Sequence, residues 1–112
     1  ASERAALLMS VKVDGYALRS ASKLLRSDKE IILAAVKQNG KVLVFAPEEL
    51  RRDREVVMAA VRQNGKALVF AHESLKNDKE VVIEAVAEGG HVALWHASEE
   101  LQKDREVLLA VQ

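Results

Sequence analysis

Three histidines, a regular series of aspartates and a pair of glycines are the residues of this chain best suited to chemistry. His91 and His96 flank Trp95, and two histidines five residues apart are a poor ligand pair on one helix face. His72 stands apart from them, and no third ligand follows at a spacing typical of a metal site. We therefore expect surface histidines and predict neither a metal site nor a cofactor.

Carboxylates recur at nearly constant spacing, as a row of catalytic residues would, at Asp28, Asp53, Asp78 and Asp104. Each aspartate, however, stands just ahead of an apolar run, where it is expected to cap a helix and contribute about 1 kcal/mol. The pair Gly89-Gly90 is not followed by the lysine and the serine or threonine of a phosphate-binding loop. No serine lies in a motif with a base, and cysteine is absent. The sequence therefore predicts a protein that is not an enzyme.

The aspartates mark the start of a short tandem repeat. Residues 28–52 and 53–77 are identical at 15 of 25 positions when they are aligned from their aspartates. Residues 1–112 divide into the units 3–27, 28–52, 53–77 and 78–103 and a half unit, 104–112. A fixed period of this length predicts one domain that folds by stacking neighbouring units.

The first half of each unit has the pattern of a helix. The capping aspartate is followed two residues later by a glutamate, which the positive end of the helix dipole favours. An apolar run comes next and ends at Asn39-Gly40 in the second unit and at Asn64-Gly65 in the third. These pairs predict helix C-caps in which the glycine adopts the left-handed conformation.

The second half of each unit leaves two alternatives open. The segment 41–46 reads K-V-L-V-F-A, which is typical of a strand, and a strand there would make each unit a βα element like a leucine-rich repeat. The other alternative is a short second helix that leads through Pro47 into a further helical turn at about 48–51. Arg19 and Ser20 in the first unit would be unusual in a shared sheet buried on both faces. We therefore predict an all-α protein, a small α-solenoid of stacked short helices.

Composition places the chain among globular proteins, with 49% hydrophobic and 30% charged residues. No apolar run approaches the length of about 18 residues that a membrane helix requires. There is no sign of a signal peptide, and the absence of cysteine fits a reducing compartment. Among compartments these features favour the cytoplasm, and we expect no membrane association.

Charge is unevenly distributed although the net charge is zero. The first 27 residues carry a net charge of +3, from five basic and two acidic residues, and residues 78–103 carry −4, from two and six. The basic cluster consists of Arg4, Lys12, Arg19, Lys23 and Arg26. A nucleic-acid-binding array using this first unit is the alternative function, but the near-neutral pI of 7.1 and the four aromatic residues make nucleic acid an improbable partner.

The half unit at the end of the chain carries the candidate interface. Its apolar residues are Val107, Leu108, Leu109 and Val111. Their counterparts in earlier units are expected to pack against a following copy, and a terminal repeat usually has a polar outer face instead. We expect these residues either to fold back as a cap or to contact another chain, and we favour a weak homodimer. The best hypothesis for function is a non-catalytic module with a structural role or an unidentified protein partner.

The repeated phrase resembles a family catalogued as domain of unknown function 4116. The matching pieces are residues 28–40, 53–65, 78–90 and 97–101, with the signature A-S-x-x-L-x-x-D-x-E and a glycine at the end of the apolar run. The first unit departs from it at Glu3, where the aspartate is replaced, and the serine is missing at Pro47 and His72. The resemblance implies a helical tandem array and carries over no catalytic residues.

Overall fold

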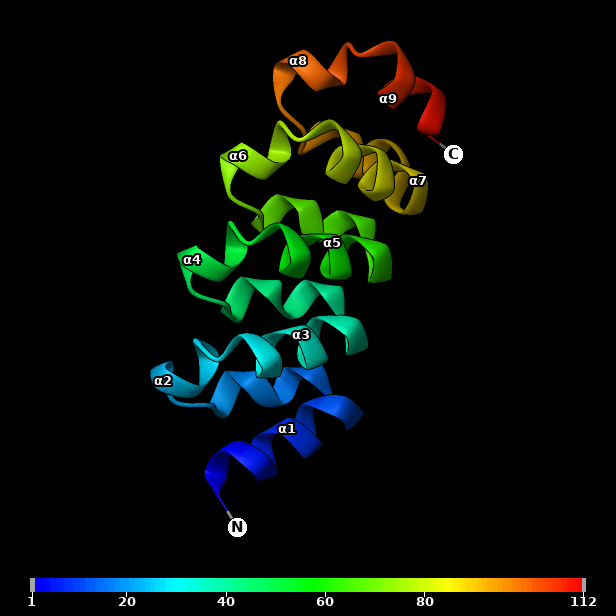
Figure 1. Ribbon diagram of the computed structural model, residues 1–112. Helices are drawn as coiled ribbons and strands as arrows, with labels where there is room; N and C mark the ends of the chain where they lie inside the picture. Colours follow the sequence, from blue (N-terminus) through cyan, green and yellow to red (C-terminus); the bar gives the residue numbers. More distant parts are fainter. Residues whose placement is uncertain (1, 112) are drawn as a thin grey trace.

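A computed structural model describes residues 2–111. Figure 1 shows a ladder of helices that rises from the N-terminus to the C-terminus. The longer helices are α1 (Glu3–Val13), α3 (Lys29–Gln38), α5 (Arg54–Gln63), α7 (Lys79–Trp95) and α9 (Arg105–Ala110). The short helices are α2 (Lys23–Arg26), α4 (Glu48–Arg51), α6 (Glu73–Lys76) and α8 (Glu99–Gln102). The 3-10 helices are η1 (Gly15–Ser20), η2 (Gly40–Phe45) and η3 (Gly65–Phe70).

Each of the first three units consists of one α-helix, a 3-10 segment and a four-residue helix that returns the chain to the next level. The longer helices stack in chain order, and the short helices line one side of the ladder (Figure 1). The stack measures 51 × 23 × 17 Å. The all-α prediction is confirmed, and residues 2–111 contain no strand, so the βα alternative was wrong.

The apolar segment of the second unit forms a 3-10 helix because side-chain capping starts a turn there. The Asn39 side chain accepts a hydrogen bond from the Lys41 N–H at 3.0 Å. Val42 and Leu43 then point into the core and are fully buried, while Val44 stays 47% exposed. A 3-10 helix has three residues per turn and satisfies its own backbone, so this strand-like composition needs no partner strand.

The predicted left-handed glycines were wrong at Gly40 and Gly65. Of the residues described, only Gly90 has a positive φ. The helices end instead at Asn39 and Asn64, whose backbones are extended. Gly40 is required for close packing, because a Cβ there would lie 2.3 Å from the carbonyl oxygen of Ala60 in the next unit.

The fourth unit is the irregular one, and Gly90 explains why. Gly90 has φ 63° and ψ −148°, a region that is essentially restricted to glycine. It allows α7 to continue through a kink up to Trp95, where the other units break into an α-helix and a 3-10 helix. This unit has 26 residues where its neighbours have 25.

The capping aspartates behave as predicted. Asp53, for example, accepts hydrogen bonds from the N–H groups of Glu55 at 3.0 Å and Val56 at 3.2 Å. For α1 the cap is Ser2, which lies just ahead of the first unit and accepts a hydrogen bond from the Ala5 N–H at 3.1 Å. The first helix therefore begins one residue earlier in its unit than the others do.

Candidate functional site

The units are joined by a repeated ion-pair seam. The basic residue at the second position of each complete unit reaches forward to two carboxylates of the next unit. Arg54 is the clearest example, because its Nε donates to Asp78 Oδ2 at 2.9 Å and its Nη2 donates to Glu80 Oε1 at 2.9 Å. Oδ2 of Asp78 thus accepts a hydrogen bond from Arg54, while Oδ1 caps α7 by accepting from backbone N–H groups of its first turn.

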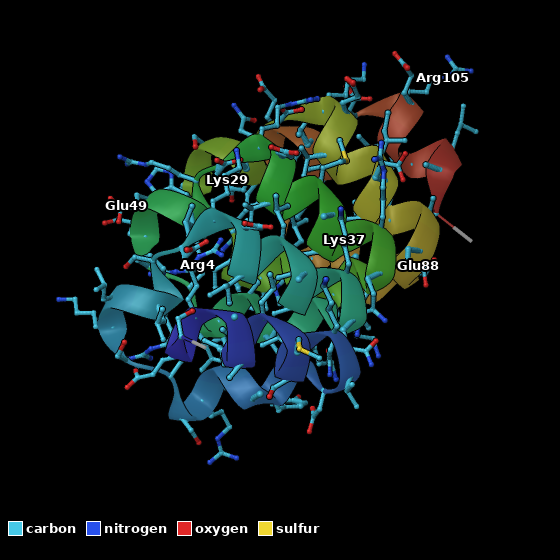
Figure 2. The ribbon with its side chains drawn as sticks, turned by 60° about the horizontal axis from the view of Figure 1, so that its bottom comes forward. Arg4, Lys29, Lys37, Glu49, Glu88 and Arg105 are labelled. Atoms are coloured by element: carbon cyan, nitrogen blue, oxygen red, sulfur yellow. The ribbon has the colours of Figure 1, made fainter. Side chains whose placement is uncertain are left out.

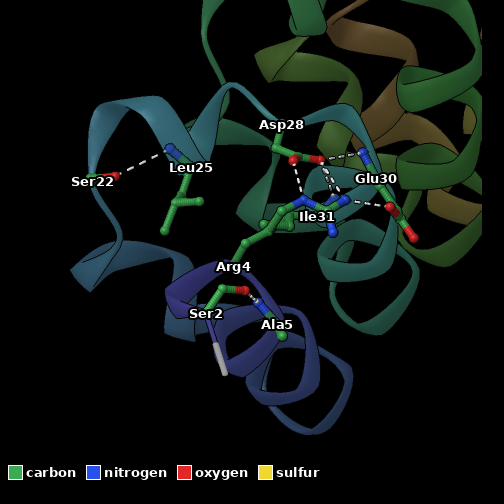
Figure 3. Close-up of polar contacts among 8 residues, drawn as sticks. All are labelled: Ser2, Arg4, Ala5, Ser22, Leu25, Asp28, Glu30 and Ile31. Carbon is green, nitrogen blue, oxygen red and sulfur yellow. Dashed lines mark hydrogen bonds and ion pairs between the residues drawn. The ribbon is translucent and has the colours of Figure 1, made fainter.

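The same arrangement occurs at every junction between α1 and α9. Figure 3 shows Arg4 bound to both Asp28 and Glu30, with an Nε–Oδ2 distance of 2.6 Å to the aspartate. Lys29 lies 2.9 Å from carboxylate oxygens of Asp53 and Glu55. Lys79 lies 3.1 Å from Asp104 and 2.7 Å from Glu106. The motif Asp-Lys/Arg-Glu therefore both receives a cation from the preceding unit and offers one to the following unit.

These contacts account for the shifted carboxylate pKa values. A hydrogen bond from Arg4 is the main reason why the pKa of Asp28 lies below its ordinary value, and Arg54 acts in the same way on the pKa of Asp78. Burial of Asp53 raises its pKa. The charge and hydrogen bond of Lys29 and the hydrogen bond from the Val56 N–H lower it by more, so the pKa of Asp53 also lies below its ordinary value. The shifts follow from the packing of the units and do not identify a catalytic group.

The seam is open at the C-terminal end of the stack. Arg105 occupies the position of Arg54 in α9 and is exposed. Within residues 2–111 it has no carboxylate partner. Figure 2 shows its side chain pointing outward from the end of the ladder.

The predicted interface residues divide between the core and this open end. Val107 is fully buried and packs in the core, so it does not belong to a contact surface. Leu108 is 47% exposed and Leu109 is 78% exposed, while Val111 is partly buried. At the position of Leu108, the earlier units have side chains that are 0% exposed: Ile32, Val57 and Val82. We call the exposed residues Arg105, Leu108 and Leu109 the C-terminal face.

A shallow surface groove lies beside the seam. It runs between α1 and α3, has a volume of about 450 Å³ and is lined by Leu8, Leu33, Lys12 and Lys37 among others. A second groove between α3 and α5 shares Leu33 and Lys37 with it. Both grooves are open to solvent, and their linings contain no histidine or serine.

The basic cluster of the first unit is spread over separate surfaces. Arg4 is paired within the seam, and Lys12 lines the groove against α3. Lys23 and Arg26 line a different depression, formed with residues 44–47. Arg19 is exposed on η1. The five side chains therefore do not form one continuous positive stripe of the kind that follows a phosphate backbone.

The histidines lie in separate local environments. His72 caps α6, where its Nδ1 accepts a hydrogen bond from the Ser74 N–H at 3.1 Å. The pKa of His96 is lowered by burial and by the nearby charge of Lys76. No group of three or more His, Cys, Asp or Glu side chains in the described part of the chain is arranged to hold a metal ion. None of the described helices has both the length and the apolar character needed to span a bilayer.

Two sets of contacting residues were missed by the sequence reasoning. The first is the series of seam cations, although a basic residue stands between the aspartate and the glutamate of every copy after the first unit. The second is the glutamine at the end of α3 and of α5. Gln38 donates to the Val13 carbonyl at 2.7 Å, and Gln63 accepts from the Gly40 N–H at 2.6 Å. The recurrence of Gln-Asn-Gly was the available signal for these cross-unit bonds.

Comparison with known proteins gave one family. The family model described as domain of unknown function (DUF4116) matches the chain twice in tandem, over residues 7–51 and 53–102. Each match spans about two of the 25-residue units. No curated protein sequence and no solved structure matches the chain.

Proposed function

This chain belongs to the DUF4116 family, and we propose that it is a non-catalytic helical-repeat module that binds another protein through its C-terminal face. The observation that carries the proposal is the difference in exposure between equivalent residues. Leu108 is 47% exposed, whereas Ile32 and Val57, in the same place in their units, are 0% exposed. Exposed apolar residues grouped at the end of a repeat array are typical of a contact surface.

The chemistry of the remaining surface supports a binding role over a catalytic one. The carboxylates whose pKa values are lowered pair with seam cations that hold neighbouring units together. The grooves beside the seam are shallow and combine lysine with leucine, which suits contact with another chain better than bond cleavage. The sequence-based prediction of a weak homodimer uses the same C-terminal face, and it stays a prediction.

The proposal is tested by capture from source extracts with matched variants. Wild-type chain, a Leu108→Glu/Leu109→Glu variant and a Val44→Glu control are immobilised side by side. Val44 is an informative control because it is also 47% exposed but lies on η2, away from α9. We expect proteins that bind wild type and the control but not the double variant. Identical captured sets for all three chains would refute binding through the C-terminal face.

Sedimentation velocity tests the homodimer in the same variants. Wild type and the Val44→Glu control should show concentration-dependent association, and the Leu108→Glu/Leu109→Glu variant should remain monomeric. Monomers for all three at high concentration would contradict the homodimer and leave a different protein as the partner.

A further inference from the structure

The two grooves beside the seam form one surface that crosses α1, α3 and α5. They share Leu33 and Lys37, and we call them together the lateral groove. We infer that the lateral groove binds a single helix of another protein, one that is amphipathic and carries acidic residues along one flank. Because α7 lies between α5 and the C-terminal face on α9, this surface goes beyond the proposed function.

The floor of the lateral groove is apolar. Leu8 and Leu33 stand at the same position of their units and are partly buried, and Met58 takes this position in α5. The next residue in the second and third units is Ala34 or Ala59, whose small side chains leave the groove open. Such a floor offers apolar surface to the leucine-rich face of an incoming helix.

One rim of the lateral groove is a row of cations. Lys12, Lys37 and Arg62 occupy the same repeat position near the ends of α1, α3 and α5, and all three are exposed. Within residues 2–111, Lys12 and Lys37 form no ion pair. Arg62 has a long one, 3.8 Å to Glu84. The row therefore offers positive charge to the carboxylates of a partner.

The opposite rim of the lateral groove belongs to the seam. Its carboxylates already have partners, because Glu30 is bound by Arg4 and Glu55 by Lys29. Figure 2 shows Arg4 and Lys29 on one side of the stack and Lys37 toward the other. An acidic flank is therefore attracted to the cation row and repelled by the seam rim, so charge complementarity fixes which way the partner helix lies.

The spacing of the cation row selects a helix over an extended peptide. Neighbouring packed helices lie about 8–10 Å apart, so the cations recur at about this interval. Seven residues of an α-helix rise about 10.5 Å and return close to the same face. Three residues of an extended chain cover about 10 Å, but successive side chains alternate, so the residue three positions on points to the opposite side. Acidic residues seven positions apart on a helix therefore meet successive levels of the stack.

The residues of the fourth unit close the lateral groove. Glu84 stands where the preceding units have Ala34 and Ala59, and Ala87 stands where they have a cation. Glu84 also competes for Arg62. The matching helix thus covers the three levels from α1 to α5, which are about 20 Å apart and require about 14 residues.

A designed peptide tests the inference with the full chain. The probe is a fluorescein-labelled peptide of about 18 residues, built from strong helix formers, with leucines on one face and a glutamate at every seventh residue along one flank. We expect saturable binding by fluorescence anisotropy that weakens at about 1 M NaCl, because the ion pairs are screened. The same peptide with glutamine in place of each glutamate should bind at least about tenfold more weakly.

Variants of the chain locate the binding site. Lys37→Glu should weaken peptide binding at least about tenfold, whereas Lys37→Arg should keep it within about twofold. Lys41→Glu makes the same charge change at an exposed lysine of η2 outside the lateral groove and should have little effect. Ala59→Glu copies Glu84 of the fourth unit and should block binding, while Glu84→Ala should strengthen it by about threefold because Arg62 loses its competitor. Circular dichroism of each variant verifies that the helices are intact.

Three outcomes would overturn the inference. The first is no saturable binding of the glutamate peptide to wild type, and the second is equal binding by wild type and Lys37→Glu. The third is a single-stranded oligonucleotide that displaces the peptide at equal concentration, which would make the cation row a nucleic-acid site. The Leu108→Glu/Leu109→Glu variant should bind the peptide as wild type does, so the lateral groove and the C-terminal face are tested independently.

Discussion

Replacing Gly40 by alanine should destabilise the stack strongly, although alanine has no difficulty with the backbone conformation there. The added Cβ would lie 2.3 Å from the Ala60 carbonyl oxygen, which is 0.7 Å inside the 3.0 Å limit that real Cβ contacts respect. That oxygen belongs to the backbone of α5 and accepts a hydrogen bond from the Asn64 N–H at 2.9 Å. Relief of the clash therefore requires two units to move apart or this hydrogen bond to lengthen.

The expected cost combines these two effects. Overpacking of a close contact costs about 1–3 kcal/mol, and a weakened hydrogen bond adds about 1 kcal/mol. The free energy of unfolding should fall by roughly 2–4 kcal/mol, and with an m-value of roughly 1.5 kcal/mol/M the urea midpoint should fall by about 1–3 M. Urea unfolding followed by circular dichroism at 222 nm measures the change.

Gly89→Ala is the matched control. There the built Cβ lies 2.9 Å from the Ala93 Cβ and 3.1 Å from the Gly65 carbonyl carbon, so the clash is milder. Alanine also gains about 1 kcal/mol of helix propensity over glycine. We expect this variant to lose much less stability than Gly40→Ala. Equal midpoints for the two variants, or a Gly40→Ala midpoint equal to wild type, would refute the close-packing explanation.

Three further predictions concern the core, the seam and acid. Ile32→Ala should cost about 2–5 kcal/mol in urea unfolding, whereas Leu108→Ala, at the same repeat position but 47% exposed, should cost less than about 1 kcal/mol; equal losses would contradict the open end. Arg54→Gln should lower the melting temperature in low salt, and the difference should shrink at 1 M NaCl because the pair is exposed; a salt-independent difference would mean that charge is not the cause. Because the pKa of Asp78 is lowered in the folded state, its stabilising contribution is present above the ordinary value of 3.8 and is lost as the pH falls through the lower folded pKa. Urea midpoints should therefore fall from pH 5 to pH 3, and less so for Asp78→Asn than for wild type.

Local rules predicted much of the fold. The capping aspartates, the apolar runs and the turn at Glu48–Arg51 each contain their signal within a few residues, and the structure confirms them. The role of Gly40 could not be found in this way, because the atom that excludes a side chain belongs to the next unit. A glycine after asparagine at a helix end has the same local pattern whether it needs a positive φ or a close approach.

Of the residues of the C-terminal face, the sequence pointed to the two leucines but not to Arg105. Leu108 and Leu109 stand out in the sequence because an apolar run occurs in an incomplete unit. Val107 belongs to the same run but is buried, since one side of α9 packs on the unit before it. The role of Arg105 could not be predicted from the sequence, because only the side-chain contacts of Arg4 and Arg54 show that a basic residue at this position binds carboxylates of the next unit.

Hydrogen exchange of arginine side chains tests the open seam most directly. In ¹⁵N NMR spectra, the Nε–H signals of Arg4 and Arg54 should exchange slowly with solvent, because each donates to an aspartate, at 2.6 and 2.9 Å. The Nε–H of Arg105 should exchange rapidly, because Arg105 has no carboxylate partner in the part of the chain that the structure describes. Single arginine-to-lysine variants assign the signals. Equal protection of Arg105 and Arg54 would contradict a seam that is closed between units and open at the C-terminal face.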